Sequence, residues 1–145
     1  MNKQIFLLCA KCVVVLLFLV MAGCEKFEDP PTTTLNIVGC WINPVYLYDT
    51  EGKTIIWFEK SKKLSANSYG IKFLNDGTLI ERKNAGWCGT PPICYADFSG
   101  NWQIQENGNI IIDVAYWGGM ERYDWKIIDI AHRTLKVEVV FREVL

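Results

Sequence analysis

Residues 69–83 read Tyr-Gly-Ile-Lys-Phe-Leu-Asn-Asp-Gly-Thr-Leu-Ile-Glu-Arg-Lys, and this stretch carries the clearest fold signal in the chain. Two runs that suit β-strands, 69–74 and 78–83, flank Asn75-Asp76-Gly77. Asn or Asp followed by Gly favours a tight turn, because Gly adopts positive φ angles at no steric cost. The stretch therefore predicts a β-hairpin.

The same pattern continues on both sides of this hairpin. Leu135, Val137 and Val139 alternate with Lys136 and Glu138 near the C-terminal end. One apolar face and one wet face are typical of a strand in an antiparallel sheet. The further segments with strand patterns are 37–42, 54–58, 96–105, 109–117, 122–130 and 134–142, with a second Asn-Gly turn at Asn107-Gly108.

About eight sequential strands, with no convincing helical stripe after residue 35, predict an all-β domain. We expect a small eight-stranded antiparallel up-and-down barrel, because closure removes exposed sheet edges. The alternative is a sandwich of the immunoglobulin type. That fold places a Tyr two residues before its second cysteine. Here Gly86 and Pro92 hold those positions before Cys88 and Cys94.

The N-terminal segment has the pattern of a secretory signal. Residues 12–24 form a short apolar run that ends in small residues, and Lys3 and Lys11 precede it. A bilayer-spanning helix needs about 20 apolar residues, so this run favours a signal peptide over residues 1–23. The alternative is a membrane anchor that is never cleaved, but Glu25 follows at once and Lys11 interrupts the only longer stretch.

Met21-Ala22-Gly23-Cys24 resembles the lipobox of bacterial lipoproteins. The resemblance implies cleavage before Cys24 and acylation of that residue, including a palmitate-type chain. It also implies membrane attachment in the cell envelope, where we expect the outer membrane, on its periplasmic face or at the cell surface. One acyl chain binds a membrane only marginally, and lasting attachment takes more than one.

Residues 24–35 then form an acidic and Pro/Thr-rich stretch, which we interpret as a tether. Its acidic start resembles the surface-export signals of Bacteroidetes lipoproteins, and an ordinary linker is the alternative.

Gly39-Cys40-Trp41 resembles the Gly-x-Trp signature of lipocalins. Residues 69–79, 87–95, 100–102 and 133–137 resemble segments of the lipocalin-like lipoprotein domains of Bacteroidetes. The resemblance implies that residues 36–145 form a barrel with a cavity open at one end. It also implies that Trp41 closes the other end, with Arg142 of the last strand packed on its ring.

Three cysteines remain after the proposed cleavage. Cys88 and Cys94 enclose Gly-Thr-Pro-Pro-Ile and could form a disulfide, which an exported compartment permits. Cys40 would then be a buried free thiol, or it pairs with one of the other two. With His132 as the single histidine, the sequence predicts neither a zinc site nor any other cofactor.

Charge and motifs exclude several functions. Without Lys3 and Lys11 the 15 basic residues fall to 13 against 16 acidic ones, and no basic cluster points to nucleic acid. The chain has no Gly-x-Ser-x-Gly elbow, phosphate loop or His-Glu-x-x-His motif. Glu81, Glu106 and Asp113 are scattered, with no pair that spacing forces together. We therefore predict a protein that is not an enzyme, with a hydrolase as the weakest alternative.

Aromatic residues supply the candidate binding site. We expect a small apolar or amphipathic ligand, and the rival function is a surface module without a cavity that contacts a protein or a glycan. Trp117 follows the alternating series that ends at Tyr116 and precedes Gly118-Gly119, so it should face outward at a loop end. The candidate residues are Phe73, Trp102, Tyr116, Trp117, Tyr123 and Trp125.

Overall fold

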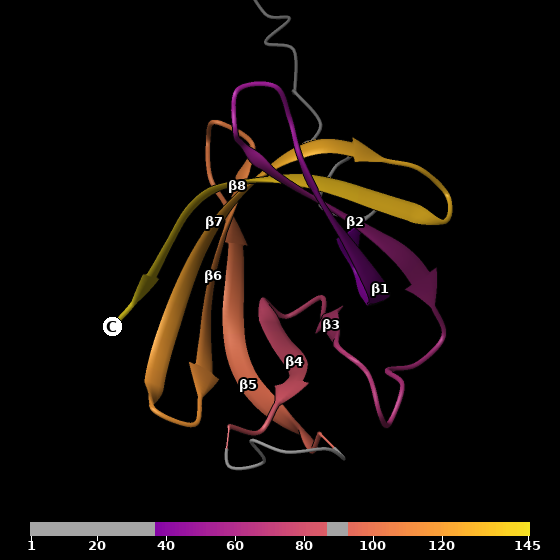
Figure 1. The fold of residues 1–145 in the computed structure, drawn as a ribbon, viewed down its shortest axis with the longest axis vertical. Coiled ribbons are helices and arrows are strands. Elements are labelled where there is room, and N and C mark those ends of the chain that lie inside the picture. Colours follow the sequence, from indigo (N-terminus) through magenta and orange to yellow (C-terminus); the bar gives the residue numbers. More distant parts are fainter. Residues whose placement is uncertain (1–36, 87–92) are drawn as a thin grey trace, which may run out of the picture. The chain divides into compact units, whose positions relative to one another are not determined.

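In a computed structural model of the chain, which describes residues 37–86 and 93–145, eight antiparallel strands form a closed β-barrel (Figure 1). This confirms the predicted fold class. The signal peptide, Cys24 and the tether lie outside the described residues, as does Cys88, and these assignments stay predictions.

The strands follow one another without an intervening helix in the described barrel. Their bounds are β1 Gly39–Tyr48, β2 Thr54–Ser61, β3 Gly70–Phe73, β4 Thr78–Asn84, β5 Tyr95–Ile104, β6 Asn109–Tyr116, β7 Gly119–Ile130 and β8 Thr134–Val144. Both Gly-containing turns form where they were predicted. Gly77 and Gly108 adopt φ angles of 81° and 82°, which glycine tolerates best.

The strand order corrects the up-and-down prediction at one place. From β3 to β8 each strand pairs with the next, but β1 lies between β2 and β3, and β2 closes the barrel against β8. The reason lies in the connections. A tight turn after Asp49 joins β1 to β2, whereas residues 62–69 carry the chain from Ser61 past β1 to Gly70 on its other side.

A packed apolar core fills one end of the barrel, which we call the closed end. Trp41 is fully buried there, and its Nε1 donates a hydrogen bond of 2.6 Å to the carbonyl of Ile37. The other members of the core include Phe58, Ile71, Phe73, Leu79, Trp102, Ile110, Ile112, Val114, Leu135 and Val137. Trp41 is thus buried in the packed end of the barrel, and its role in closing the barrel stays a prediction.

The expected packing of Arg142 on Trp41 is wrong. The cation over the Trp41 ring is Lys60, with its Nζ 5.2 Å from the ring centroid. Arg142 instead lies over Tyr123. The direction of β8 explains the difference, because this strand begins at Thr134, opposite Glu59 near the closed end, and runs away from Trp41. Its last residues reach the opposite end, which we call the open end.

A bulge divides β1 into two halves. Its pairing with β3 covers Gly39 to Ile42, and the register with β2 shifts between Ile42 and Val45. Asn43 has a φ angle of 53° at this point, and Pro44 follows it. Bulges bend a strand and end its pairing, so the second half of β1 continues on β2 alone.

Candidate functional site at the open end of the barrel

Four charged side chains from three strands meet inside the open end. Glu81 and Lys83 come from β4, Glu121 from β7 and Arg142 from β8. The Lys83 Nζ lies 2.7 Å from Glu81 Oε2 and 3.0 Å from Glu121 Oε2, and Arg142 Nη2 donates a 2.8 Å hydrogen bond to Glu121 Oε1. We call these four residues the acid–base cluster.

Two tyrosines complete the bonding of the carboxylates. Tyr69 donates from its hydroxyl to Glu81 Oε1 at 2.5 Å, and Tyr123 donates to Glu121 Oε2 at 2.5 Å. The Tyr123 ring also lies beneath both cations, 5.9 Å from Lys83 Nζ and 5.4 Å from the guanidinium carbon of Arg142. Cations over an aromatic face are attracted to it, so Tyr123 contributes through its ring as well as its hydroxyl.

Burial explains why these charges are paired. The side chains of Glu81 and Glu121 are 2% and 8% exposed, and a buried carboxylate is costly without partners. Burial alone would raise the pKa of Glu121, but hydrogen bonds from Tyr123, Arg142 and Lys83 outweigh it and lower the pKa to about 2. Burial and the charge of Glu81 raise the pKa of Tyr69 well above its usual value. The hydroxyl of Tyr69 therefore stays a donor.

Arg142 and Tyr46 form the solvent-facing side of the cluster. The Arg142 side chain is 61% exposed, and Nη2 to Glu121 is its one hydrogen bond among the described residues, so further N–H groups are free to donate. Tyr46 pairs with Ile56, an inward residue, so its ring points into the open end while half of it is exposed. Burial and the nearby charge of Glu81 raise the Tyr46 pKa, with Arg142 opposing them.

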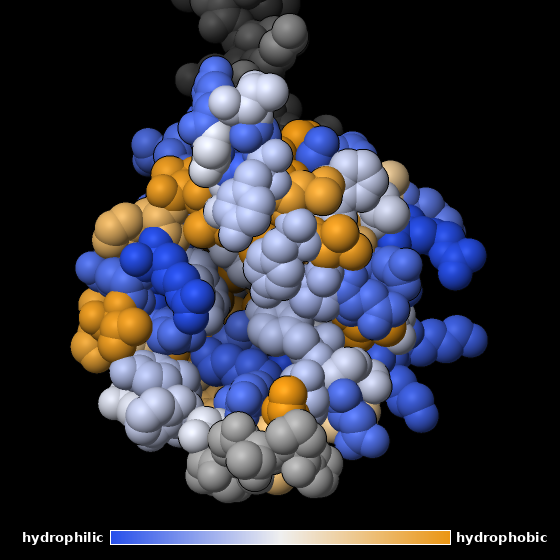
Figure 2. Space-filling model, viewed as in Figure 1, coloured by the Kyte–Doolittle hydropathy of each residue, from blue (hydrophilic) through white to orange (hydrophobic). Residues whose placement is uncertain are grey.

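An apolar rim surrounds this polar interior. Met120 accepts a backbone hydrogen bond from Leu145, which brings the β6–β7 turn beside the end of β8. Exposed apolar side chains in the segments that begin or end here are Tyr48, Ile93, Trp117, Val144 and Leu145, and we call them the rim. Figure 2 shows apolar side chains lying directly beside strongly hydrophilic ones on the face it displays. The open end therefore offers charge inside and apolar surface around it.

The sequence-predicted aromatic residues separate into two groups. Phe73, Trp102 and Trp125 are buried in the core, where Phe73 meets Trp102 edge-on with ring centroids 5.4 Å apart. Tyr123 stacks on Trp125 at 5.8 Å and connects the core to the acid–base cluster. Their burial in a packed interior favours a structural role for Phe73, Trp102 and Trp125, whereas Tyr123 reaches the candidate site.

The second group lies at the β6–β7 turn. Trp117 is 68% exposed, as the alternation along β6 predicted, and Tyr116 is half-buried with its ring centroid 5.9 Å from that of Trp117. The two residues belong to the open end, which leaves them available for contact with a ligand. Their binding role stays a prediction.

Sequence reasoning missed Glu81, Lys83 and Glu121 as a unit. Glu81 and Glu121 are 40 positions apart in the chain and meet only because the barrel closes. A signal was nevertheless present in the alternation. Glu81 shares the inward face of β4 with Leu79, and Glu121 shares the inward face of β7 with Tyr123. A charged residue on an otherwise apolar face indicates a buried partner of opposite charge.

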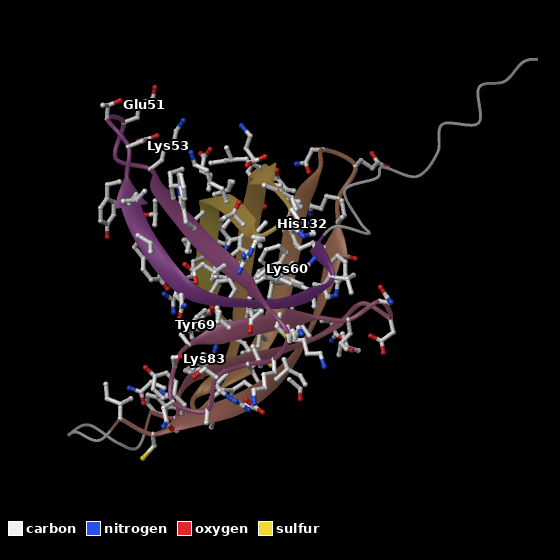
Figure 3. The ribbon with its side chains drawn as sticks, turned by 90° about the vertical axis from the view of Figure 1, so that its right-hand side faces the viewer. Glu51, Lys53, Lys60, Tyr69, Lys83 and His132 are labelled. Carbon is white, nitrogen blue, oxygen red and sulfur yellow. The ribbon has the colours of Figure 1, made fainter. Side chains whose placement is uncertain are left out.

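Cysteine and metal chemistry add little to this site. Cys40 is a buried free thiol, in agreement with the preferred expectation. The predicted pairing of Cys88 with Cys94 involves a residue outside the described ones and stays a prediction. Among residues 37–86 and 93–145, no group of His, Cys, Asp and Glu is placed to hold a metal ion. His132 lies with Lys60 at the closed end beside a hollow of about 150 Å³, remote from the acid–base cluster (Figure 3).

No helix within the described ranges is long and apolar enough to cross a membrane. Comparison with family models, with curated protein sequences and with solved structures finds no match to this chain.

Proposed function

We propose that the protein is an exported, lipid-anchored barrel that binds a small amphipathic ligand at its open end. The observation that carries the proposal is the largely exposed Arg142, which keeps N–H groups available while Glu121 holds it in place. It lies between an acid–base interior and an apolar rim. A site that places polar groups in fixed positions beside apolar side chains suits a small ligand with both kinds of surface.

The geometry gives each part of the ligand a place. A polar group that accepts hydrogen bonds would meet Arg142 and the hydroxyl of Tyr46, and the apolar part would lie against Trp117 and Leu145. Arginine suits planar anionic acceptors because its N–H donors form a rigid fork. Since Glu121 already orients the guanidinium, binding has little side-chain ordering left to do.

A purely apolar ligand fits this site less well. It would cover Arg142 and remove water from the guanidinium without replacing the lost hydrogen bonds, and that burial is unfavourable. The sequence suggested an apolar or an amphipathic ligand, and we retain the amphipathic one.

Anchoring is the second part of the proposal and rests on the sequence of residues 12–24. In this view Cys24 is acylated and holds the barrel at the membrane of the cell envelope, where we place it in the outer membrane. Cell fractionation of a Cys24→Ala variant tests this part. Loss of membrane partition is expected, and a variant that is still processed and still partitions with membranes contradicts it.

The rival function is an interaction module that contacts a protein or a glycan through the same rim. Exposed Trp117 and Tyr48 favour it, because aromatic side chains are enriched at interfaces. The two functions differ in the role of Arg142. A small amphipathic ligand needs this residue at the centre of its site, whereas a broad surface contact does not.

Titration of the purified protein with a fluorescent long-chain carboxylic acid tests the ligand. Saturable binding is expected, weakened at least about tenfold in Arg142→Gln, because a charge-assisted hydrogen bond contributes about 1.5–3 kcal/mol. Glu106→Gln, which alters an exposed turn residue, is the matched control and should bind as the parent does. Absence of saturable binding, or equal affinity in Arg142→Gln, refutes the ligand proposal.

A further inference from the structure

The second half of β1 has a neighbour on one side only. Val45 to Tyr48 pair with Trp57 to Thr54 of β2, but the pairing of β1 with β3 stops at Ile42, opposite Gly70. Since β3 begins at Gly70, no described strand continues beside Val45–Tyr48. The barrel therefore contains a free strand edge at its open end.

The backbone groups on this edge can be identified. Asp49 N–H donates to the carbonyl of Lys53 at 3.1 Å, so this pair is a hydrogen-bonded pair of the antiparallel ladder. Hydrogen-bonded and non-hydrogen-bonded pairs alternate along the ladder. The backbone N–H and C=O groups of Leu47 and Val45 therefore point toward β2, and those of Tyr46 and Tyr48 point away from it. The N–H and C=O groups of Tyr46 and Tyr48 thus face the free edge. The β1–β3 ladder ends at Ile42, and no backbone hydrogen bond outside the strand ladders of the described residues uses them.

The edge lacks the usual protection beyond its first residue. Natural edge strands carry charged residues, proline or bulges that prevent pairing with other chains. Pro44 and the bulge protect the start of this segment, but Val45, Tyr46, Leu47 and Tyr48 are apolar or aromatic and 45–75% exposed. An unprotected edge with exposed apolar side chains is the surface that strand addition uses.

We propose that the edge at Val45–Tyr48 binds an extended peptide segment of a partner protein as an added strand. The two faces of β1 determine the chemistry of that segment. Side chains next to Tyr46 and Tyr48 point into the open end, where Arg142 is the exposed charge, so acidic or hydroxyl residues fit there. Side chains next to Val45 and Leu47 point outward onto apolar surface. The partner segment therefore alternates apolar and acidic residues.

The position of the edge favours an extended segment over a second copy of the chain. An added strand would continue the line of β3 between β1 and β4, where Lys83 and Asn84 extend beyond the last β3 pair at Arg82. A segment with two free edges can pair on both sides. The β1 of a second copy cannot, because its other edge is already occupied by β2.

Figure 3 agrees with this arrangement. The tip of the β1–β2 hairpin, marked by Glu51 and Lys53, stands apart from Tyr69 and Lys83. The inference does not depend on the small ligand proposed above. Both involve Arg142, but strand addition rests on backbone groups that the ligand does not need.

Amide hydrogen exchange followed by NMR tests the edge in the free protein. Fast exchange is expected at Tyr46 and Tyr48, and slow exchange at Val45 and Leu47, whose N–H groups face β2. Protection of Tyr46 and Tyr48 in the dilute monomer overturns the proposal. Protection that appears only as the protein concentration rises, together with a dimer in size-exclusion chromatography, would mean that the edge binds a second copy of the chain. That result also overturns the proposal.

Peptide binding tests the occupant. The probe is a synthetic peptide of alternating Val and Glu, and the control is the same peptide N-methylated on the residues of one edge. We expect the parent peptide to bind and to slow amide exchange at Tyr46 and Tyr48. A peptide that is N-methylated along either one of its two edges should bind at least about tenfold more weakly, since it loses backbone pairing on that edge. No binding of the parent peptide at about 1 mM, or equal binding of the methylated forms, overturns the proposal.

Two variants at position 48 distinguish the contribution of the backbone N–H to peptide binding from that of the side chain. Tyr48→Pro removes an edge N–H and leaves the β1–β2 ladder intact, whereas Tyr48→Ala removes the ring and keeps the N–H. We expect the proline variant to bind the peptide about tenfold more weakly than the alanine variant. Circular dichroism and the unfolding midpoint show whether each variant folds. If the proline variant does not fold, the methylated peptides decide the question on the parent protein.

Discussion

Arg142 of β8 donates a 2.8 Å hydrogen bond to Glu121 of β7, at the end of the barrel opposite Trp41. The same Glu121 carboxylate accepts from Tyr123 and contacts Lys83 at 3.0 Å. Three strands are thereby joined through one side chain. The open end of the barrel accordingly owes its geometry to Glu121, and the first prediction concerns this residue.

Glu121 should make stability depend on pH in acid. Its pKa is about 2 in the folded protein against an ordinary value of 4.5, so the unfolded chain binds the proton more tightly. The stabilisation is present above about pH 4.5 and is lost as pH falls toward 2. We expect a loss of about 1–3 kcal/mol, reduced by salt because Arg142 is largely exposed. Urea unfolding at a series of pH values in parent and Glu121→Gln measures it.

Glu121→Gln should lose the part of the unfolding free energy that depends on acid pH. Glu106→Gln should retain it, since Glu106 lies in an exposed turn. Parallel pH profiles in the parent and Glu121→Gln would mean that other carboxylates dominate acid unfolding.

Lys83 should be essential for the stability of the open end. Lys83→Met leaves Glu81 and Glu121 buried without the cation that lies between them, which should cost about 3–5 kcal/mol. Adding Glu81→Gln should recover part of that loss, because Glu81 is the carboxylate left without a cation, whereas Glu121 keeps Arg142. Urea unfolding of the two single variants and the double variant completes the cycle. A cost below about 1 kcal/mol for Lys83→Met would indicate that water reaches the cluster and replaces the lysine.

Trp117 and Gly86 should show strong coupling. Trp117→Ala alone should change stability by about 1 kcal/mol or less, because the side chain is exposed. A Cβ added at Gly86 would meet the Trp117 ring at 2.0 Å, and the φ angle of 84° is unfavourable for alanine. Gly86→Ala should therefore cost more in the parent than in Trp117→Ala, where only the backbone strain of about 1 kcal/mol remains. Thermal unfolding of the four proteins measures the coupling, and additive effects would contradict the contact.

The disulfide prediction remains open to a direct test. We expect peptide mapping under non-reducing conditions to find Cys88 linked to Cys94, with Cys40 alkylated only after unfolding, because this thiol is buried. Any linkage to Cys40 would require its strand to move, and it would contradict both the sequence-based pairing and the free thiol.

Local sequence signals predicted the strands well. The turns at Gly77 and Gly108 followed from steric preference, and the alternation of Ile110, Ile112 and Val114 correctly identified the buried face of β6. Alternation also placed Trp117 outside. These features depend on neighbouring residues in the chain, which is why the sequence alone contains them.

Features that depend on closure could not be obtained in this way. Nothing between Ser61 and Gly70 indicates on which side of β1 the chain continues, so the strand order was missed. A register shift in β8 places Arg142, rather than Phe141, on the inward face opposite Tyr123. Strict alternation would have turned Arg142 outward. The end of the barrel that β8 reaches depends on its pairing with β2 and β7, which the sequence does not reveal.

The brevity of β3 has a consequence for how the barrel moves. This strand has four residues, whereas β7 and β8 have 12 and 11. Few backbone hydrogen bonds hold it on either side, so detaching β3 costs less free energy than detaching any longer strand. Transient opening of the barrel should begin as a sideways parting of its wall at β3, with the β6–β7–β8 sheet intact. Interior protons beside β3 would then exchange with solvent earlier than those at the same depth beside β7.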